Sequence, residues 1–283
     1  DRDRSLLASL DVATRVARLE RKNRHNLATA AMFLFTRWLF VLAVFVAAHL
    51  SLAGYAEFGV LAPFAAMTGL LILATAYFVL IERASLGFGR LRPSMITIFD
   101  ADFWWHERHW KLSDSFLAGF LAGTPFRGSL LRLLGVKVGP KVYDGGAMIT
   151  ERTLTEIDGY ANLNESCVLQ AHSLEEGAFK SDVIQIGEGC SVGPAAFVHY
   201  GVKMGRQAVL DADSFLIKGE TLGEGTGWRG NPAKLHRAPL VKVASVEGVK
   251  IQQLVARPRG NAPLKNHGET ARPSVAAART AHA

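Results

Sequence analysis

The residues with the clearest chemical potential lie in segment 170–182, which reads Q-A-H-S-L-E-E-G-A-F-K-S-D. Acyl transfer from a thioester needs a base that takes a proton from the attacking amine or hydroxyl, and a neutral imidazole has a suitable pKa for this task. We therefore predict that His172 is a catalytic base. The alternative is that this histidine only caps a turn.

Charged side chains follow His172 closely in the sequence. We predict that four of them bind the substrate: Glu175, Glu176, Lys180 and Asp182. The three carboxylates among them could orient the imidazole ring or hold a cationic acceptor. His199 is the second catalytic candidate, as a site residue from a neighbouring repeat, and a purely structural role is its alternative.

A dense group of aromatic and cationic residues occupies positions 103–110, F-W-W-H-E-R-H-W. Because it lies shortly after an apolar segment, we interpret it as an interfacial belt at a membrane surface rather than as an acceptor pocket. His106 and His109 are three residues apart, and no third ligand has a spacing suited to zinc. The sequence therefore predicts no metal site.

The candidate residues sit within a repeat of six residues, in which an aliphatic residue begins each hexad. Seven consecutive hexads keep this register, starting at Ile186, Val192, Val198, Met204, Leu210, Leu216 and Leu222. An earlier, broken set starts at Val136, Val142, Met148, Leu163 and Leu169. A period of six fits neither an amphipathic helix nor a strand, so the repeat itself must be the structural unit. We predict a parallel β-helix in which three hexads complete one coil, whereas a set of ordinary strands is the alternative.

The hexad rhythm stops after Leu169 and resumes at Ile186. An irregular loop is therefore expected to leave the coil just after His172, and loops on a rigid scaffold often carry sites. The chain has two cysteines, Cys167 and Cys190, and both fall on small, inward hexad positions. Buried packing is favoured over a nucleophile or a disulfide, and this pattern suits a reducing compartment.

Two apolar segments precede the repeat. Residues 58–81 run for 24 residues without a charge, and at 1.5 Å per residue this spans the roughly 30 Å hydrocarbon core of a bilayer. Residues 27–52 form a second candidate span, interrupted only by Arg37 and His49. Basic residues precede and follow the pair but are missing between the spans, which predicts a hairpin with both ends in the cytoplasm. A buried core helix is the alternative for each segment.

The net charge of +7 is unevenly distributed. Residues 144–226 contain 13 acidic and 5 basic residues, so the positive charge lies beside the apolar segments and in the tail. The basic regions suit anionic lipid, and an acidic coil would repel phosphate, so we predict membrane lipid as a partner and no nucleic acid. The alternative for the acidic residues is that they only solvate turns.

The hexads resemble those of the hexapeptide-repeat acyltransferases, and the ending W-R-G-N-P-A-K at 228–234 is similar to the segment with which such domains leave their last coil. The resemblance implies a left-handed coil and trimers with active sites between neighbouring coils. It also implies a catalytic histidine at a coil-to-loop junction, as for His172. Contacts with the acyl donor are expected at Trp228, Asn231 and Lys234.

The combination of two spans, F-W-W-H-E-R-H-W-K-L, Q-A-H-S-L-E-E-G-A-F-K-S-D and F-V-H-Y-G-V resembles the C-terminal membrane region of ε-poly-lysine synthetase-type nonribosomal peptide synthetases. The resemblance implies that the chain ends a longer polypeptide with adenylation and carrier domains. The acyl donor would be a phosphopantetheinyl thioester on the carrier, with no tightly bound cofactor, and the acceptor a small cationic amine. Other coil domains would complete a trimer or pseudo-trimer. No adenylation or carrier motif is present in this chain.

The predicted fold class is mixed: an N-terminal α-helical transmembrane hairpin followed by a left-handed parallel β-helix that faces the cytosol at the plasma membrane. Two alternatives to a peptide-bond-forming module remain, a stand-alone transferase that uses acetyl-CoA and a non-catalytic trimerising scaffold. The predicted parts are a basic amphipathic segment (1–26), the hairpin (27–82), aromatic-rich connecting helices (83–135), the coil domain (136–237) and an extension (238–283) that is disordered from about residue 257.

Overall fold

The computed structural model describes residues 11–113 and 119–239. These residues belong to one compact unit within Asp1–Leu240. Nearly all of the predicted C-terminal extension (238–283) lies outside the described residues, as do the first ten residues.

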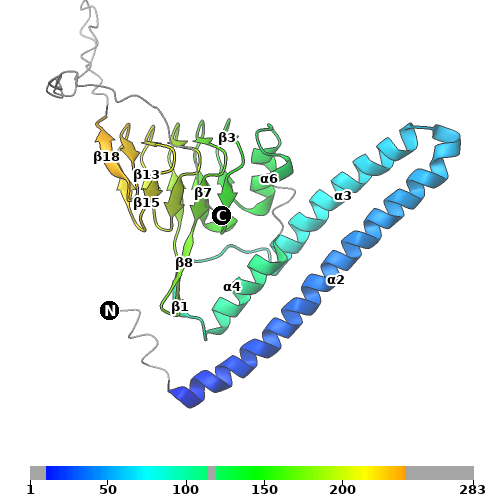
Figure 1. Cartoon of the computed structure of the whole chain (residues 1–283), viewed down its shortest axis with the longest axis horizontal. Coiled ribbons are helices and arrows are strands. Elements are labelled where there is room, and N and C mark those ends of the chain that lie inside the picture. Colours follow the sequence, from blue (N-terminus) through cyan, green and yellow to red (C-terminus); the bar gives the residue numbers. More distant parts are fainter. Residues whose placement is uncertain (1–10, 114–118, 240–283) are drawn as a thin grey trace, which may run out of the picture. The chain divides into compact units, whose positions relative to one another are not determined.

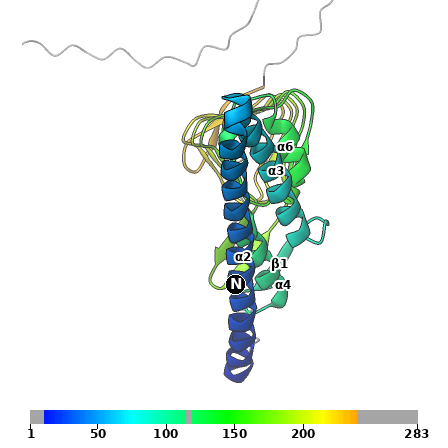
Figure 2. The ribbon, with the colours of Figure 1, turned by 90° about the vertical axis from the view of Figure 1, so that its right-hand side faces the viewer.

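Two long helices, α2 (Val12–Phe58) and α3 (Leu61–Ser85), run antiparallel to each other (Figures 1 and 2). Helix α2 begins at Asp11, whose carboxylate accepts a hydrogen bond from the backbone N–H of Thr14 at 2.7 Å. No glycine or proline interrupts the sequence between residues 12 and 53. For this reason the predicted basic segment and the first predicted span form one continuous helix, which ends at Gly59 (φ 54°).

Both helices are long and apolar enough to cross a membrane, judged by length and composition. The most apolar window of α2 has none of its residues buried, and that of α3 has 11% buried. Large apolar side chains such as Phe45 and Phe64 are exposed (67% and 72%). This exposure disfavours the alternative of a buried core helix for either segment.

The hexads form short parallel strands in three sheets, which are the three faces of a coil (Figure 1). The order in the first sheet is β16-β13-β10-β5-β2, in the second β18-β17-β14-β11-β6-β3, and in the third β15-β12-β7-β4. Each strand from β2 to β17 in these sheets pairs in parallel with its counterpart one coil away, whereas β18 pairs antiparallel with β17. The parallel strand arrangement is therefore confirmed, while the left-handed sense stays a prediction. The bounds are β2 Lys137–Val138, β3 Tyr143–Asp144, β4 Met148–Ile149, β5 Thr155–Ile157, β6 Asn162–Leu163, β7 Val168–Gln170, β10 Ile184–Ile186, β11 Ser191–Val192, β12 Phe197–His199, β13 Lys203–Met204, β14 Val209–Leu210, β15 Phe215–Leu216, β16 Thr221–Leu222, β17 Gly227–Arg229 and β18 Lys234–Arg237.

The predicted inward register holds from Leu163 onward. The aliphatic residues stack in columns, for example Leu169, Val198 and Leu216, and all three are fully buried. Cys167 and Cys190 are also fully buried and free. Burial raises the pKa of the Cys167 thiol to about 12 and that of Cys190 to about 11, so both stay protonated, as packing residues would.

The predicted register of the first coil is wrong. Met148 is exposed (60%), and Ile149 instead enters the column of Leu169. Asp144 occupies the column position two residues after the predicted Val142. Its carboxylate is buried against the guanidinium of Arg127, with Nε and Oδ2 2.8 Å apart. A charged pair occupies the inward position at this end of the coil, so the spacing of aliphatic residues does not predict that Asp144 points inward.

The segment after His172 is a regular β-hairpin rather than the predicted irregular loop. Strands β8 (His172–Glu175) and β9 (Ala178–Ser181) pair antiparallel, and β1 (Ser94–Thr97) adds to β9. The turn residues Glu176 (φ 49°) and Gly177 (φ 76°) both have positive φ, as two-residue hairpins of type I′ require. The hexad rhythm stops here because the chain forms a separate three-stranded sheet.

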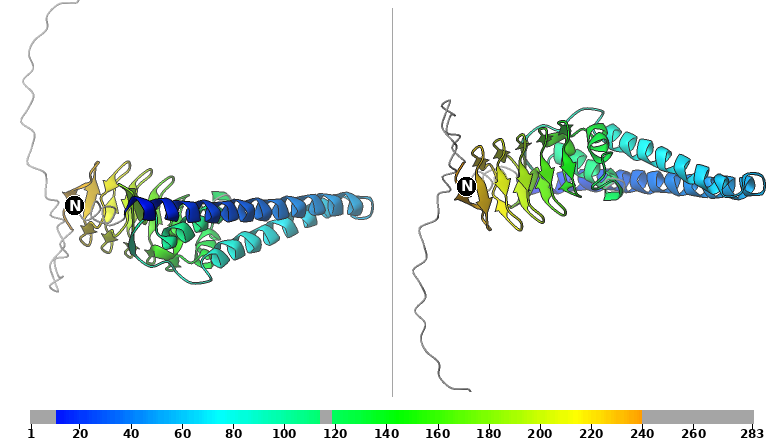
Figure 3. Two further views of the ribbon diagram at one scale, coloured as in Figure 1. Left: turned by 90° about the horizontal axis from the view of Figure 1, so that it is seen from below. Right: turned by 90° about the horizontal axis from the view of Figure 1, so that it is seen from above.

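Shorter helices connect the hairpin of α2 and α3 to the coil. Helix α4 (Ala101–Leu112) packs beside the β8–β9 hairpin, and α6 (Arg127–Leu134) lies at the start of the coil. Figure 3 shows α2 and α3 extending beyond this end of the coil. A 3-10 turn, η1 (Arg152–Leu154), follows β4.

The aromatic segment 103–110 lies mostly inside the protein. Phe103, Trp104, His106 and His109 are all buried, and within this segment only Trp105 has a largely exposed ring (55%). Phe103 and Trp104 form a buried cluster with Phe179 of the β8–β9 hairpin. The structure therefore does not bear out an interfacial belt, because these rings are covered by protein.

Candidate active site

His172 lies against the fully buried carboxylate of Glu151. His172 is the first residue of β8, where the chain leaves the third sheet of the coil, and Glu151 immediately precedes η1. Nδ1 of His172 is 2.7 Å from Oε1 of Glu151, and the two side chains are 18% and 0% exposed. The oxygen lies off the N–H direction, so this is a close contact between the ring nitrogen and the carboxylate rather than a well-aligned hydrogen bond.

Two residues of α4 share this carboxylate. Trp110 donates its indole N–H to Oε1 at 2.8 Å, and Nε2 of His106 lies 3.4 Å from the same oxygen. Burial raises the pKa of Glu151, but the hydrogen bond from His106 and the interaction with His172 outweigh burial and hold the pKa well below its usual range. The carboxylate is therefore charged at neutral pH and can stabilise an imidazolium.

Aromatic rings hold the imidazole of His172 in place. The centroid of the Trp110 ring is 4.6 Å away, and the Phe179 ring is stacked on it at 5.8 Å and 28°. Among the residues that the structure describes, none forms a hydrogen bond with Nε2 of His172. One ring nitrogen is thus held by a carboxylate while the other is available, which is the arrangement of a general base with an orienting partner.

His199 has a different environment. Its Nδ1 accepts the backbone N–H of Tyr200 at 3.0 Å, and its ring packs edge-on against Phe197. Burial lowers the pKa of His199. Because Nδ1 is occupied by a backbone donor, the geometry favours the structural alternative for this residue, and the catalytic role stays a prediction.

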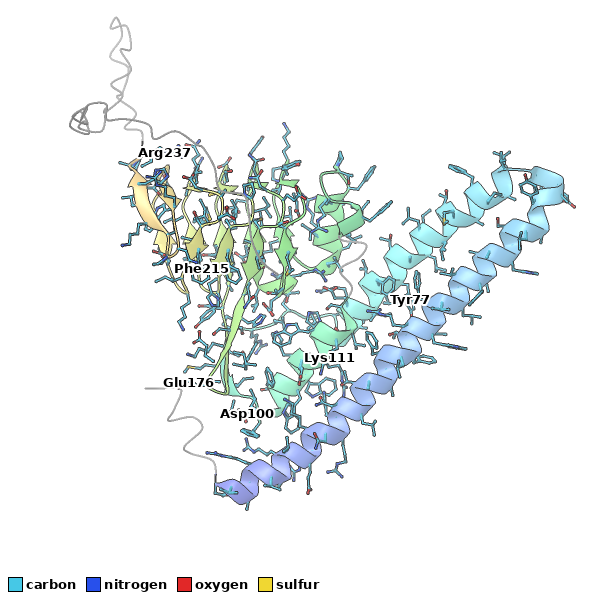
Figure 4. The ribbon with its side chains drawn as sticks, in the orientation of Figure 1. Tyr77, Asp100, Lys111, Glu176, Phe215 and Arg237 are labelled. Carbon is cyan, nitrogen blue, oxygen red and sulfur yellow. The ribbon has the colours of Figure 1, made fainter. Side chains whose placement is uncertain are left out.

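Two of the four predicted substrate-binding residues, Glu175 and Glu176, lie at the far end of the hairpin. Lys180 and Asp182 lie near its other end, where Ser173 pairs with Lys180 and His172 pairs with Ser181. Glu175 is three residues along the strand from His172, about 10 Å, and its carboxylate is 2.7 Å from Nζ of Lys218 and 3.6 Å from Nζ of Lys180. The hydrogen bond from Lys218 lowers the pKa of Glu175. Figure 4 shows Glu176 at the hairpin tip. Orientation of the imidazole, predicted for these carboxylates, is instead provided by Glu151.

Asp182 begins the return from the hairpin to the coil. Its Oδ1 accepts the backbone N–H of Val183 at 2.7 Å, so it holds the chain at this junction. Substrate binding by Asp182 and Lys180 stays a prediction.

The predicted donor-binding residues are at the other end of the coil. Trp228 lies in β17 and Lys234 in β18, and the indole N–H of Trp228 donates to Oγ1 of Thr226 at 2.9 Å. Three strand pairings separate β17 from β6, which belongs to the same coil as β7, a separation of about 14 Å. The structure does not bring Trp228, Asn231 or Lys234 to His172 within one chain.

Sequence reasoning missed Glu151, Trp110 and His106 as parts of the site. A signal existed for Glu151, because the hexad rhythm is also broken between Met148 and Leu163. The sequence of the aromatic segment predicts a place at the membrane surface, whereas His106 and Trp110 contact Glu151. Its histidines also have separate partners: His106 contacts Glu151, whereas Nδ1 of His109 is 2.8 Å from Oγ of Ser85.

No family model matches the chain. A sequence relative is the Delta-poly-L-ornithine synthetase of Acinetobacter baumannii (strain AB307-0294), 29% identical over 149 residues. The match covers 51% of this chain and 11% of that synthetase, so this chain corresponds to only a small part of its length.

Similar solved structures include a galactoside acetyltransferase in complex with coenzyme A, at 15% identity and a TM-score of 0.39, covering 51% of this chain and 86% of that chain. Another is a maltose O-acetyltransferase from Clostridium difficile 630, at 13% identity and a TM-score of 0.36, covering 56% of this chain and 97% of that chain. The sequence relative is named as a synthetase, and these similar structures are named as acetyltransferases.

Proposed function

We propose that this chain is a membrane-anchored enzyme of the transferase type, an acyltransferase module that joins an aminoacyl thioester to an amine. The observation that carries the proposal is the imidazole of His172, held through Nδ1 by the buried Glu151 carboxylate with Nε2 available. This pair is built for taking a proton from a nucleophile, because the carboxylate orients the ring and stabilises the imidazolium that forms.

In the proposed reaction the amine nitrogen attacks the carbonyl carbon of the thioester. Nε2 of His172 takes the proton of the amine, the C–N bond forms, and the C–S bond breaks to release the thiolate. Because a free amine is mostly protonated at neutral pH, the site must bind it partly desolvated. The imidazolium then returns its proton to the leaving thiolate or to solvent.

The proposed donor is a phosphopantetheinyl thioester on a carrier domain, and the proposed acceptor is a basic amino acid or a growing peptide. The name of the sequence relative, a poly-ornithine synthetase, supports a basic amino acid as building block. Adenylation and carrier domains of a longer polypeptide would supply the donor. The predicted donor-binding residues of this chain lie at the other end of its coil from His172. Other coil domains, as a trimer or pseudo-trimer, would bring their own donor-binding surface close to His172.

The proposed location is the cytoplasmic membrane, with α2 and α3 as two spans and the coil in the cytosol. The two candidate spans support it by length, apolar composition and exposure. The lack of lysine and arginine between Arg37 and Arg83 supports the orientation.

The test is the variant His172→Ala in the complete synthetase, with labelled amino acid loaded on the carrier. We expect peptide formation to fall by about 10² to 10⁴-fold, the usual contribution of a general base. Loading of the carrier should be unchanged. His199→Ala is the matched control and should retain most of the activity, because its Nδ1 already binds a backbone N–H. Normal product from His172→Ala would contradict the proposed function.

A further inference from the structure

The residue that follows the site carboxylate contacts the end of a predicted membrane span. The guanidinium of Arg152 forms an ion pair with the carboxylate of Glu82, in the last turn of α3, and both side chains are buried (9% and 2% exposed). Neighbouring residues of one loop therefore face in two directions: Glu151 contacts His172, and Arg152 contacts α3.

The segment directly after α3 holds the same loop at two further points. Arg90 donates from Nη2 to the carbonyl oxygen of Thr153 at 2.6 Å, and the backbone N–H of Leu91 donates to Oγ1 of Thr153 at 3.0 Å. Consecutive residues of η1 are thus held by α3 and its continuation. Such a loop has little freedom to shift Glu151 relative to His172.

The other donors to Glu151 lie on α4, and polar contacts connect α4 and its N-terminal cap to α2. Arg108 donates to Oγ1 of Thr29 at 2.9 Å, and Arg18 pairs with Asp100 at 2.8 Å. Without α4, the Glu151 carboxylate would lose Trp110 and His106, and the His172 ring would lose one of its stacking partners. The coil by itself does not contain a complete site.

We propose that the cytoplasmic ends of α2 and α3 are a working part of the active site, and that Glu82 and Arg152 are positioning residues for the Glu151–His172 pair. The inference rests on the proposed function for its catalytic meaning. The membrane hairpin then sets the geometry of the base as well as anchoring the enzyme. Because a misplacement of about 1 Å can cost about 10²-fold in rate, a small movement of η1 has a measurable effect.

The experiment compares Glu82→Gln with the double variant Glu82→Gln/Arg152→Met in the complete, membrane-inserted synthetase. The single variant removes one charge of a buried pair, which destabilises a protein by about 3–5 kcal/mol, whereas removing both charges is often neutral for stability. If the pair only stabilises the fold, the double variant restores activity. If it positions Glu151, kcat for peptide formation stays about 10- to 100-fold low in the double variant, with little change in KM.

A second readout needs no substrate. The protein is treated with diethyl pyrocarbonate at a fixed pH, and mass spectrometry measures how fast each histidine is modified. The modification ratio is the rate for His172 divided by the rate for His199 in the same molecule. We expect modification of His172 to become severalfold faster in the double variant, because the ring loses its fixed environment. The double variant Asp144→Asn/Arg127→Met is the matched control: it removes both charges of the equally buried pair at the start of the coil, and the modification ratio should stay at the wild-type value.

The outcomes separate this inference from the proposed function. A double variant with wild-type kcat and a wild-type modification ratio overturns the inference, even if His172→Ala is inactive. If His172→Ala retains activity while the modification ratio still rises in the double variant, the positioning contact stands and the assignment of the base fails.

Discussion

A carboxylate with no solvent exposure is costly unless its charge is fully compensated. Glu151 meets this condition through Trp110, His106, His172 and the hydroxyl of Thr150. The compensation explains why the pKa is low despite burial. A charged Glu151 has a direct consequence for His172, because a fixed negative charge beside Nδ1 favours the proton at that nitrogen and leaves Nε2 as the acceptor.

We predict that Glu151→Gln lowers the rate of peptide formation by at least about 10²-fold and lowers the unfolding free energy by about 2 kcal/mol. Since the folded-state pKa of Glu151 is lowered, its ionised form stabilises the fold at neutral pH, and this stability is lost as pH falls below the ordinary value of 4.5 toward the folded value. The loss should be weaker in Glu151→Gln. Assays of peptide formation measure the change in rate. Thermal midpoints of the purified protein between pH 7 and pH 3 measure the change in stability and its dependence on pH.

Glu188→Gln serves as the comparison for this variant. It removes an exposed pair with Arg206 at 2.9 Å, and exposed pairs contribute about 0–1 kcal/mol. If the two variants behave alike in rate and in acid stability, Glu151 is not a positioning residue.

The β8–β9 hairpin and α4 depend on each other at the scale of elements. An isolated hairpin is at best marginally stable in water, so it needs a third strand and a packed face. Strand β1 supplies the third strand, and the α4 rings supply the packed face through Phe179. The tip is fixed as well, since the backbone N–H of Ile98 donates to the carbonyl oxygen of Gly177 at 3.1 Å.

We predict that Phe179→Ala destabilises the docked hairpin by about 3–5 kcal/mol, because the side chain is fully buried and its removal leaves a cavity between α4 and the sheet. The hairpin should then become the first site of cleavage in limited proteolysis, and peptide formation should fall with it. Leu174→Ala is the matched control on the same hairpin, since this side chain is 53% exposed and its loss should cost less than about 0.5 kcal/mol. Equal protease sensitivity of the two variants would show that α4 does not hold the hairpin.

For the whole molecule, the position of the charges determines the expected orientation in a membrane. Basic residues precede α2's apolar stretch and follow that of α3, at Arg15, Arg18, Arg21, Lys22, Arg24, Arg83, Arg90 and Arg92. The site is assembled at this same basic end of the hairpin, because α4 contacts α2 near Arg18 and η1 contacts α3 at Glu82. A cytoplasmic basic end therefore also requires a cytoplasmic site.

We predict that a cysteine at Ala53 reacts with an impermeant maleimide added to intact cells, whereas a cysteine at Glu224 reacts only after the membrane is opened. Both positions are exposed in the structure. The two native cysteines are fully buried and should give little background in the folded protein. Labelling of the cysteine at position 224, but not of that at position 53, in intact cells would reverse the topology and place the site outside.

The sequence alone was enough to predict the features that a local period or a run of one residue type encodes. The coil from Leu163 onward follows from the regular return of aliphatic residues, and the two long helices follow from the length of their apolar runs. The break in this rhythm also singles out His172, whose catalytic role stays a prediction. In each case the physical cause is local in the sequence. The coil depends on an aliphatic residue at every sixth position, and each long helix depends on an unbroken run of apolar residues.

Only the tertiary structure decided what His172 contacts. Trp110 and Glu151 are 41 positions apart, and Glu82 and Arg152 are 70 apart, so no periodicity could link them. The first coil was misread for the same reason, since Asp144 is acceptable inside only because Arg127 arrives from another element. Buried polar groups are tolerated where a distant partner compensates their charge. The site is made of such groups, and their partners are set by how the elements pack.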